Sequence, residues 1–256
     1  MHVAHGCNLS CESCSHYSNQ GHRGLLSVEE ADRWIGAWST RLNLQTFTLL
    51  GGEPTINSAL ADIFLVARQY WPLAHLKLIT NGFFLHRHPK LLAMLKSDTN
   101  MSICLSIHHD SPEYRERIKP ILDLLNSWAR DFRVRVEYIL SYKNWTLRYH
   151  GHGNSIEPYS DKRQRQSWEN CPAKYTPQLH DGKLWKCAPL AYLQLQKMKF
   201  DLSDKWDPYL AYQSLAPECN EKQLSDFFHR EDEEFCGMCP ANPVRIDLPL
   251  PLKIKR

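Results

Sequence analysis

The sequence predicts an α/β fold built on a parallel sheet. Over the first 142 residues, short apolar and β-branched segments alternate with amphipathic segments of helical period. Five strand candidates and four helix candidates follow one another in strict alternation, which favours right-handed crossovers between parallel strands. The sheet can be an open doubly wound sheet or a partial (β/α) barrel of about five to six strands. In both, reactive side chains gather at the carboxyl ends of the strands.

Each element has a local signal of its own. A short strand is expected at 2–5, just before Cys7. The helix at 27–42 begins with Ser27 as N-cap, and Glu30 stands where a capping box places its glutamate. The other strand candidates are 44–50, 76–80, 101–109 and 133–141, and the other helix candidates are 58–71, stopped by Pro72, 89–96, and 111–130, with a kink or break at Pro120.

Composition narrows the class of protein. The chain has 256 residues, 43% hydrophobic and 23% charged, which suits one large domain or a domain with a small appendage. A net charge of +3 is too small to indicate nucleic-acid binding. No apolar run reaches the ~18 residues of a membrane span, and no signal peptide opens the chain. We therefore expect a cytoplasmic protein whose nine cysteines bind metal or do redox chemistry.

The periodic pattern fades after residue 142, and this divides the chain. We expect a core at 1–142, a linker or substrate loop at 143–170, a second cysteine-rich domain at 171–240 and a tail at 241–256. The charge run at 161–166 is expected to be solvated, and the proline-interrupted basic end at 249–256 to be mobile. An Asp181-Gly182 turn predicts a hairpin that carries Cys187 back beside Cys171.

Three cysteines lie within eight residues: Cys7, Cys11 and Cys14. Soft thiolates favour zinc, copper(I) or an iron–sulfur cluster. A zinc site would need a fourth ligand, which His16 could supply. A cubane cluster held by three cysteines instead keeps one iron open for a small-molecule ligand.

The Cys7-x3-Cys11-x2-Cys14 motif after the first strand, together with GGEPT at 51–55 after the second, resembles the radical SAM superfamily. The resemblance implies a 4Fe–4S cluster whose open iron binds S-adenosylmethionine. It also implies that Glu53 supports the loop beside the methionine amino group. Ser13 departs from the aromatic residue that the family often has near adenine, and Tyr17 could replace it. The implied cofactor contacts are Gly51, Gly52, Glu53, Pro54, Thr55, Asn81 and Ser106.

The second cysteine set begins as C-x10-G-x4-C, from Cys171 through Gly182 to Cys187, and resembles the opening of SPASM and twitch domains. Five cysteines fit the shorter twitch type, which implies a second 4Fe–4S cluster. Cys219 could replace one of its ligands or stay idle, and a structural zinc is the alternative. Cys104 is expected to be a buried small hydrophobe. The implied ligands are Cys171, Cys187, Cys236 and Cys239.

The resemblance implies an enzyme that cleaves S-adenosylmethionine reductively, abstracts a substrate hydrogen and passes an electron to the second cluster. In layout it is similar to radical SAM dehydrogenases of the deoxy-scyllo-inosamine type, which favours a sugar or aminocyclitol substrate. A flavodoxin or ferredoxin-type donor is implied. His108 or His109 should point into the cavity because strand side chains alternate. The loop offers further candidates for substrate binding: Arg148, His150, His152 and Asn154.

Two other functions stay open. The enzyme could crosslink or epimerise a ribosomal peptide, although the six residues before Cys7 leave no room for an N-terminal leader-binding domain. Alternatively, the chain could be a non-catalytic zinc or iron–sulfur binding module.

Overall fold

The computed structural model describes residues 1–252. Its main sheet has the order β1-β2-β3-β4-β5, and every neighbouring pair is parallel. The sheet stays open at β1 and β5, as in a partial barrel, so the predicted fold class is confirmed. The strands are β1 (His2–Ala4), β2 (Thr46–Gly51), β3 (His75–Thr80), β4 (Met101–Ile107) and β5 (Arg135–Leu140).

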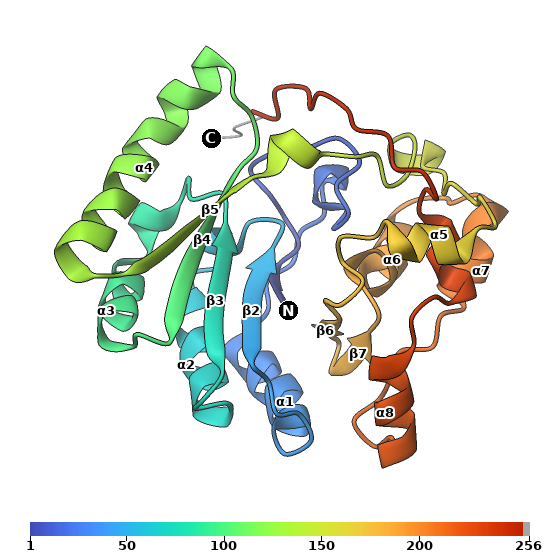
Figure 1. Ribbon diagram of the computed structural model, residues 1–256, viewed down its shortest axis with the longest axis horizontal. Coiled ribbons are helices and arrows are strands. Elements are labelled where there is room, and N and C mark those ends of the chain that lie inside the picture. Colours follow the sequence, from blue (N-terminus) through green and yellow to red (C-terminus); the bar gives the residue numbers. More distant parts are fainter. Residues whose placement is uncertain (253–256) are drawn as a thin grey trace.

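Four helices cover the outer side of this sheet (Figure 1). The first begins as expected, because Glu30 N donates to Ser27 Oγ at 3.1 Å and Ser27 N donates to a Glu30 carboxylate oxygen at 3.0 Å. Between helices and strands lies an apolar core in which Ile35, Phe64 and Leu78 have no exposed surface. The helices are α1 (Val28–Ser39), α2 (Leu60–Tyr70), α3 (Pro89–Ser97) and α4 (Pro112–Phe132).

Of the kink or break expected at Pro120, the break is wrong, since the 21-residue helix α4 runs through this position. A proline inside a helix removes one hydrogen bond to the carbonyl four residues earlier, here that of Glu116. Both residues are exposed. Water can therefore bind the freed carbonyl, and the helix tolerates the loss.

The C-terminal segment packs across from α1–α4 (Figure 1). Asp181 and Gly182 have φ of 51° and 69°, so the predicted two-residue hairpin turn is confirmed between β6 and β7. The elements are α5 (Gln164–Glu169), β6 (Gln178–His180), β7 (Lys183–Trp185), α6 (Ala188–Lys199), α7 (Asp207–Leu210) and α8 (Glu221–His229). Short 3-10 helices cover Ser18–Gln20, Pro54–Ile56, Leu85–Arg87, Ser141–Asn144, Gly153–Ser155, Asp204–Trp206 and Glu234–Met238.

The hairpin joins the two halves of the molecule. Leu179 and Leu184 are buried in the same apolar cluster as the sheet and its helices. Trp38 of α1 donates its indole N–H to the Gly182 carbonyl at 2.9 Å. A second apolar cluster lies around α6 and includes Tyr17 from the first cysteine loop. The C-terminal hairpin therefore packs into the core of the N-terminal sheet, and the first cysteine loop packs into the apolar cluster around α6.

Of two expectations about irregular segments, the first is confirmed and the second is wrong. The charge run at 161–166 is solvated, since Lys162, Arg163 and Arg165 are exposed, although it leads into α5, in which Trp168 is buried. The end of the chain, expected to be mobile, is packed: Leu248 is buried, and the Pro251 carbonyl accepts from Ser10 N at 2.9 Å. The remainder of the expected mobile end, 253–256, lies outside the described residues. In the described part of the chain, none of the helices combines the length and the apolar composition of a membrane span.

Candidate active site

The three cysteines of the first motif line one cavity at the carboxyl edge of the sheet. Its volume is about 200 Å³, and Cys7, Cys11 and Cys14 all contribute to its wall. Burial raises the pKa of each thiol, and the neighbouring thiols raise those of Cys7 and Cys11 further. A positively charged metal group removes this penalty when it binds thiolates. The donor set therefore fits a thiolate-bound metal cofactor.

His16 does not complete a single-metal site with these thiols. Its ring packs edge-on against the His2 ring, with centroids 4.6 Å apart. Among residues 1–252, no three His, Cys, Asp or Glu side chains are gathered closely enough to hold one metal ion. The cysteines of a 4Fe–4S cluster each bind a different iron, so they stand further apart than ligands of a single zinc. The arrangement favours a cluster over zinc.

Close packing between two backbone segments of the chain requires glycine at positions 51 and 52. A Cβ atom at Gly51 would collide with the Ala4 carbonyl, and one at Gly52 with the Gly6 carbonyl. Gly52 N and Glu53 N donate to these same two carbonyl oxygens at 2.8 Å. The glycines thus fasten the first cysteine loop to the end of β2, and both also line the cavity.

Glu53 ties two loops together beneath the cavity. It has no exposed surface, and its Oε1 accepts from Thr55 N at 3.0 Å and from the Thr80 hydroxyl at 2.5 Å. Its Oε2 accepts from Asn81 N at 2.8 Å. Burial raises the pKa of this carboxyl, while the four donors favour its charged form. Pro54 and Thr55 lie behind it and do not line the cavity.

Asn81 and Ser106 reach the same cavity from β3 and β4. The Asn81 side chain donates to Asn8 Oδ1 at 2.8 Å, which links it to the first cysteine loop. The Ser106 hydroxyl has no hydrogen bond within the described residues and is 7% exposed, so it is free for a ligand. The structure therefore places both residues where a bound cofactor could meet them.

His108 is the histidine that points into the cavity. Its Nδ1 lies 3.5 Å from Cys11 Sγ, and burial lowers its pKa to about 4. The His109 ring instead accepts from Ser111 N at 2.9 Å, at the start of α4. The sequence pattern predicted that one of the pair faces inward, and the contact with Cys11 was not foreseen.

The second cysteine set gathers four of its five members. Cys171, Cys187 and Cys239 line a second, larger cavity. Cys236 lies close enough to Cys171 and Cys239 for their charges to interact. Burial raises the pKa of Cys239 to about 12, and the nearby Arg148 guanidinium opposes that shift. The four thiols form a donor set of the same kind as the first, with one more member.

Cys219 stands apart from this set. It packs against the main core, where Arg41 donates to its sulfur at 3.2 Å and to its carbonyl at 2.6 Å. Cys104 is buried with no exposed surface in β4, as expected. Neither thiol lines either cavity.

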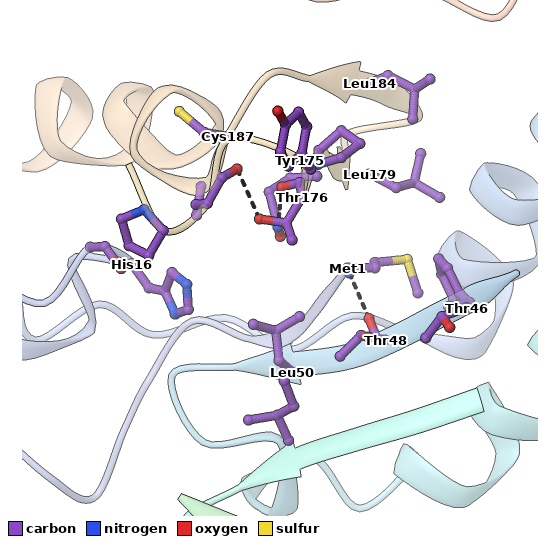
Figure 2. A pocket seen from close by; sticks show the side chains of 18 of the residues that line it. Met1, His16, Thr46, Thr48, Leu50, Tyr175, Thr176, Leu179, Leu184 and Cys187 are labelled. Atoms are coloured by element: carbon purple, nitrogen blue, oxygen red, sulfur yellow. Dashed lines mark hydrogen bonds between the residues drawn. The ribbon is translucent and has the colours of Figure 1, made fainter. Parts of the chain in front are cut away.

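The larger cavity, about 600 Å³, lies between the sheet and the C-terminal segment. Figure 2 shows Thr46, Thr48 and Leu50 of β2 on one wall and Tyr175, Thr176, Leu179 and Leu184 on the opposite wall. It adjoins the cavity of the first cysteines, because the two share four lining residues. The shared residues are Ser15, His16, Leu50 and Ile79.

Arg148 lines the larger cavity, whereas the other loop candidates do not. His150 packs on Tyr159 at 4.2 Å, His152 is exposed, and Asn154 accepts from Asp201 N at 3.2 Å. These three residues line neither cavity.

Ser13 and Tyr17 have roles that sequence reasoning missed. The Ser13 hydroxyl accepts from Arg148 N at 2.7 Å and donates to the Tyr149 carbonyl at 2.9 Å. Tyr17 is buried and stacks on Tyr149, with ring centroids 5.1 Å apart. Both Ser13 and Tyr17 have positive φ, near 50°. The residues considered for the adenine site therefore fasten segment 145–149 to the first cysteine loop.

An open parallel α/β sheet with three thiols around one cavity and a glycine-rich turn at its carboxyl edge is typical of enzymes that hold an iron–sulfur cluster beside a small cofactor. A model of the Radical SAM superfamily matches residues 1–129. Since this is half of the chain, the protein belongs to the radical SAM superfamily. Membership implies S-adenosylmethionine and a 4Fe–4S cluster, and the three thiols are a donor set that fits the cluster.

Curated relatives match part of the chain. A GTP 3′,8-cyclase of Aquifex aeolicus (strain VF5) is 28% identical over 116 residues, 44% of this chain and 35% of that protein. A probable GTP 3′,8-cyclase of Aeropyrum pernix is 32% identical over 121 residues, 44% of this chain and 32% of that protein. The chain thus spans about a third of the length of these relatives.

A solved structure of anSMEcpe with bound AdoMet and Cp18Cys peptide is also similar. Its sequence identity is 16% and its TM-score 0.41, covering 53% of this chain and 40% of that chain.

Proposed function

We propose that this radical SAM enzyme is an oxidoreductase with two 4Fe–4S clusters, which oxidises a small organic substrate held between them. The observation that carries the proposal is the position of the 600 Å³ cavity. It adjoins the cavity of Cys7, Cys11 and Cys14 on one side and is lined by Cys171, Cys187 and Cys239 on the other. A substrate there is within reach of both thiol sites.

When bound at the first site, the cofactor and its cluster supply a 5′-deoxyadenosyl radical after one-electron reduction. The protein positions the cofactor and the substrate, and it shields the reacting carbon from water. Gly51 and Gly52 present backbone at the cavity, Glu53 holds their loop against that of Asn81, and the free Ser106 hydroxyl faces the ligand space. Apolar walls keep water from the reacting carbon.

The substrate reaction balances as a two-electron oxidation. A substrate C–H bond would lose its hydrogen atom to the 5′-deoxyadenosyl radical, which gives 5′-deoxyadenosine. The substrate radical left behind would lose a proton and one electron, and the second cluster would supply the acceptor for that electron. Cys171, Cys187, Cys236 and Cys239 are the proposed ligands of that cluster. A flavodoxin or ferredoxin-type protein is the proposed source of the first electron.

The cavity walls bear on the choice of substrate. They are mostly apolar, with Phe47, Trp71 and Leu184 among the lining residues. A sugar or aminocyclitol needs many hydrogen-bond partners when it leaves water. The lining therefore lends little support to the expected polyhydroxylated substrate and favours a less polar one. GTP cyclisation, the activity in the names of the relatives, stays outside the proposal.

Anaerobic reconstitution tests the proposal. The loaded protein should contain two 4Fe–4S clusters, and dithionite with S-adenosylmethionine should yield 5′-deoxyadenosine. Cys236→Ala should lose about half of the iron, since each cluster holds an equal share. Cys219→Ala and Cys104→Ala are matched controls that should keep all of it.

Three outcomes would contradict parts of the proposal. A colourless, zinc-loaded protein would mean a binding module. A fully loaded protein that does not cleave the cofactor would exclude the radical reaction. Full iron in the Cys236→Ala protein would refute the second ligand set.

A further inference from the structure

We propose that Arg148 is the anchor for an anionic group of the substrate, so that the substrate is a small molecule with an apolar body and one carboxylate or phosphate. This inference rests on the proposed function, because it assigns the 600 Å³ cavity to the substrate. The evidence is the charge and composition of the cavity wall.

The described wall of the cavity holds one side chain of the Arg, Lys, Asp and Glu types. Of the described residues that line it, Arg148 is the one Arg or Lys, and there is no Asp or Glu. His16 also lines it, and its ring packs edge-on against the ring of His2. A cationic group placed against Arg148 would be repelled by its guanidinium.

The Arg148 guanidinium has no hydrogen bond or ion pair to any other residue within 1–252, although the side chain is half-buried. The other arginines of comparable burial are paired; Arg41 and Arg68, for example, each bind a carboxylate at 2.8 Å or less. A half-buried guanidinium is stabilised by an anion that takes two of its N–H donors. No residue within 1–252 hydrogen-bonds this guanidinium, and we assign that role to an anionic group of the substrate.

The backbone at Arg148 is held before any ligand arrives. Ser13 Oγ accepts from Arg148 N and Tyr149 N at 2.7 and 2.9 Å, and the Tyr149 ring stacks on Tyr17. Trp145 donates to the Glu12 carbonyl at 2.8 Å. A binding group on such a fixed segment costs little entropy to position.

The rest of the wall fits the apolar body. Aromatic and aliphatic side chains come from both halves of the molecule, and a cavity of this size suits a small organic ligand. Burial of the body would supply affinity, and the Arg148 pair would fix its orientation. The lining residues that form the apolar surface include Leu44, Phe47, Trp71, Leu179, Leu184 and Phe228.

Arg148 also lies near Cys239. Its charge could therefore serve the second cluster alone, and the experiment must separate the two roles. Binding of model compounds does so, because it reports on the cavity directly. The holoenzyme, with both clusters loaded, is titrated by anaerobic calorimetry with 4-phenylbutanoate, 3-phenylpropyl phosphate, 4-phenylbutanamide and 4-phenylbutylamine.

We expect the carboxylate or the phosphate to bind at least tenfold more tightly than the amide, and the amine to bind most weakly. Whichever anion is the tighter identifies the anionic group of the substrate. Arg148→Gln should abolish the preference for the anion and leave the affinity for the amide within twofold. Arg148→Lys should keep part of the preference, because it retains the charge but not the paired donors. Arg163→Gln, an exposed arginine outside the cavity, is the matched control.

Equal binding of all four compounds, or an anion preference that survives in Arg148→Gln, would overturn the inference. So would a variant whose affinity falls only together with its iron content, because Arg148 would then serve the cluster. Cofactor cleavage by the same preparations is measured in parallel. A protein that forms 5′-deoxyadenosine but ignores the charge of the probe would refute the Arg148 assignment and leave the proposed function standing.

Discussion

Glu53 shows how one buried carboxylate can organise a cofactor loop. Four donors from Thr55, Thr80 and Asn81 converge on its two oxygens. Each buried donor that loses its acceptor is left without a partner. Glu53 therefore acts on the shape of the cavity and does not need to touch the substrate.

Glu53→Gln should lower the free energy of unfolding by about 1–3 kcal/mol, since the amide N–H2 group would face donors in place of an acceptor. Urea denaturation of the metal-free protein measures the change. Glu116→Gln, on the exposed face of α4, should change stability by less than about 0.5 kcal/mol. Equal stability of the two variants would show that the Glu53 network contributes nothing.

His108 is placed to tune the first cluster through Cys11. With its proton on Nδ1, the ring donates to the sulfur, and hydrogen bonds to cluster sulfurs raise the reduction potential. His108→Leu removes this donor, so the potential of the first cluster should fall by an amount on the order of tens of mV. A redox titration followed by electron paramagnetic resonance measures it. His109→Leu should leave the potential unchanged, and an equal shift in both variants would contradict the role of His108.

At the scale of elements, the segment 245–251 acts as a strap over the first cysteine loop. Ile246 N donates to the Trp145 carbonyl at 3.0 Å, and Ser10 N donates to the Pro251 carbonyl. Between these points, buried Leu248 packs with Leu9 and Cys11. The strap thus covers the outer side of the thiols.

Leu248→Ala should open this cover and leave a cavity beside Cys11. We expect the first cluster of the reconstituted protein to lose its iron several-fold faster in air than the wild type. The bleaching of the iron–sulfur absorbance measures the rate. Leu250→Ala is the matched control, because Leu250 is 39% exposed and makes no such contact. Equal rates in the two variants would mean that the strap does not shield the cluster.

At the scale of the whole molecule, a cluster of histidines lies where the two halves meet. His2 stacks on Tyr192 of α6 at 3.9 Å, and the rings of His5 and His180 pack beside them. Neither ring nitrogen of His2 has a hydrogen-bond partner within the described residues. Burial lowers the pKa of His180 to about 4, and of His2 well below its ordinary value.

The lowered pKa values of these histidines predict that acid destabilises the folded protein. The unfolded chain takes up protons near pH 6.5, whereas the folded rings resist them until about pH 4. Stability is therefore full above pH 6.5 and falls as the pH drops through this window. Because of His180 alone, the free energy of unfolding should fall by on the order of 2 kcal/mol between pH 7 and pH 5. Urea denaturation of the metal-free protein at several pH values measures the slope.

His180→Gln should flatten that slope, while His229→Gln, an exposed histidine at the end of α8, should leave it unchanged. A wild-type stability that stays constant from pH 7 to pH 5 would contradict the buried, neutral state of these histidines.

Much of the fold was predictable because its signals are local. The alternation of strands and helices, the Ser27–Glu30 capping box and the Asp181-Gly182 turn each depend on residues close in sequence. The helix at Pro120 and the packing of α5 were not predictable in this way. Whether a lost hydrogen bond is tolerated, or an aromatic side chain beside a charge run is buried, depends on exposure, which the neighbouring elements set.

For the candidate site, the sequence by itself determined the three-thiol motif, the glycine-rich turn beside it and the hairpin that returns Cys187 toward Cys171. These depend on spacing along the chain and on the meeting of parallel strand ends at one edge. Only the tertiary structure decided that Cys219 pairs with Arg41 and not with the other cysteines, that His108 rests on Cys11, and that Arg148 faces an apolar cavity between the two thiol sites. The reason is physical: each of these contacts joins residues far apart in sequence, so its partner is chosen by packing.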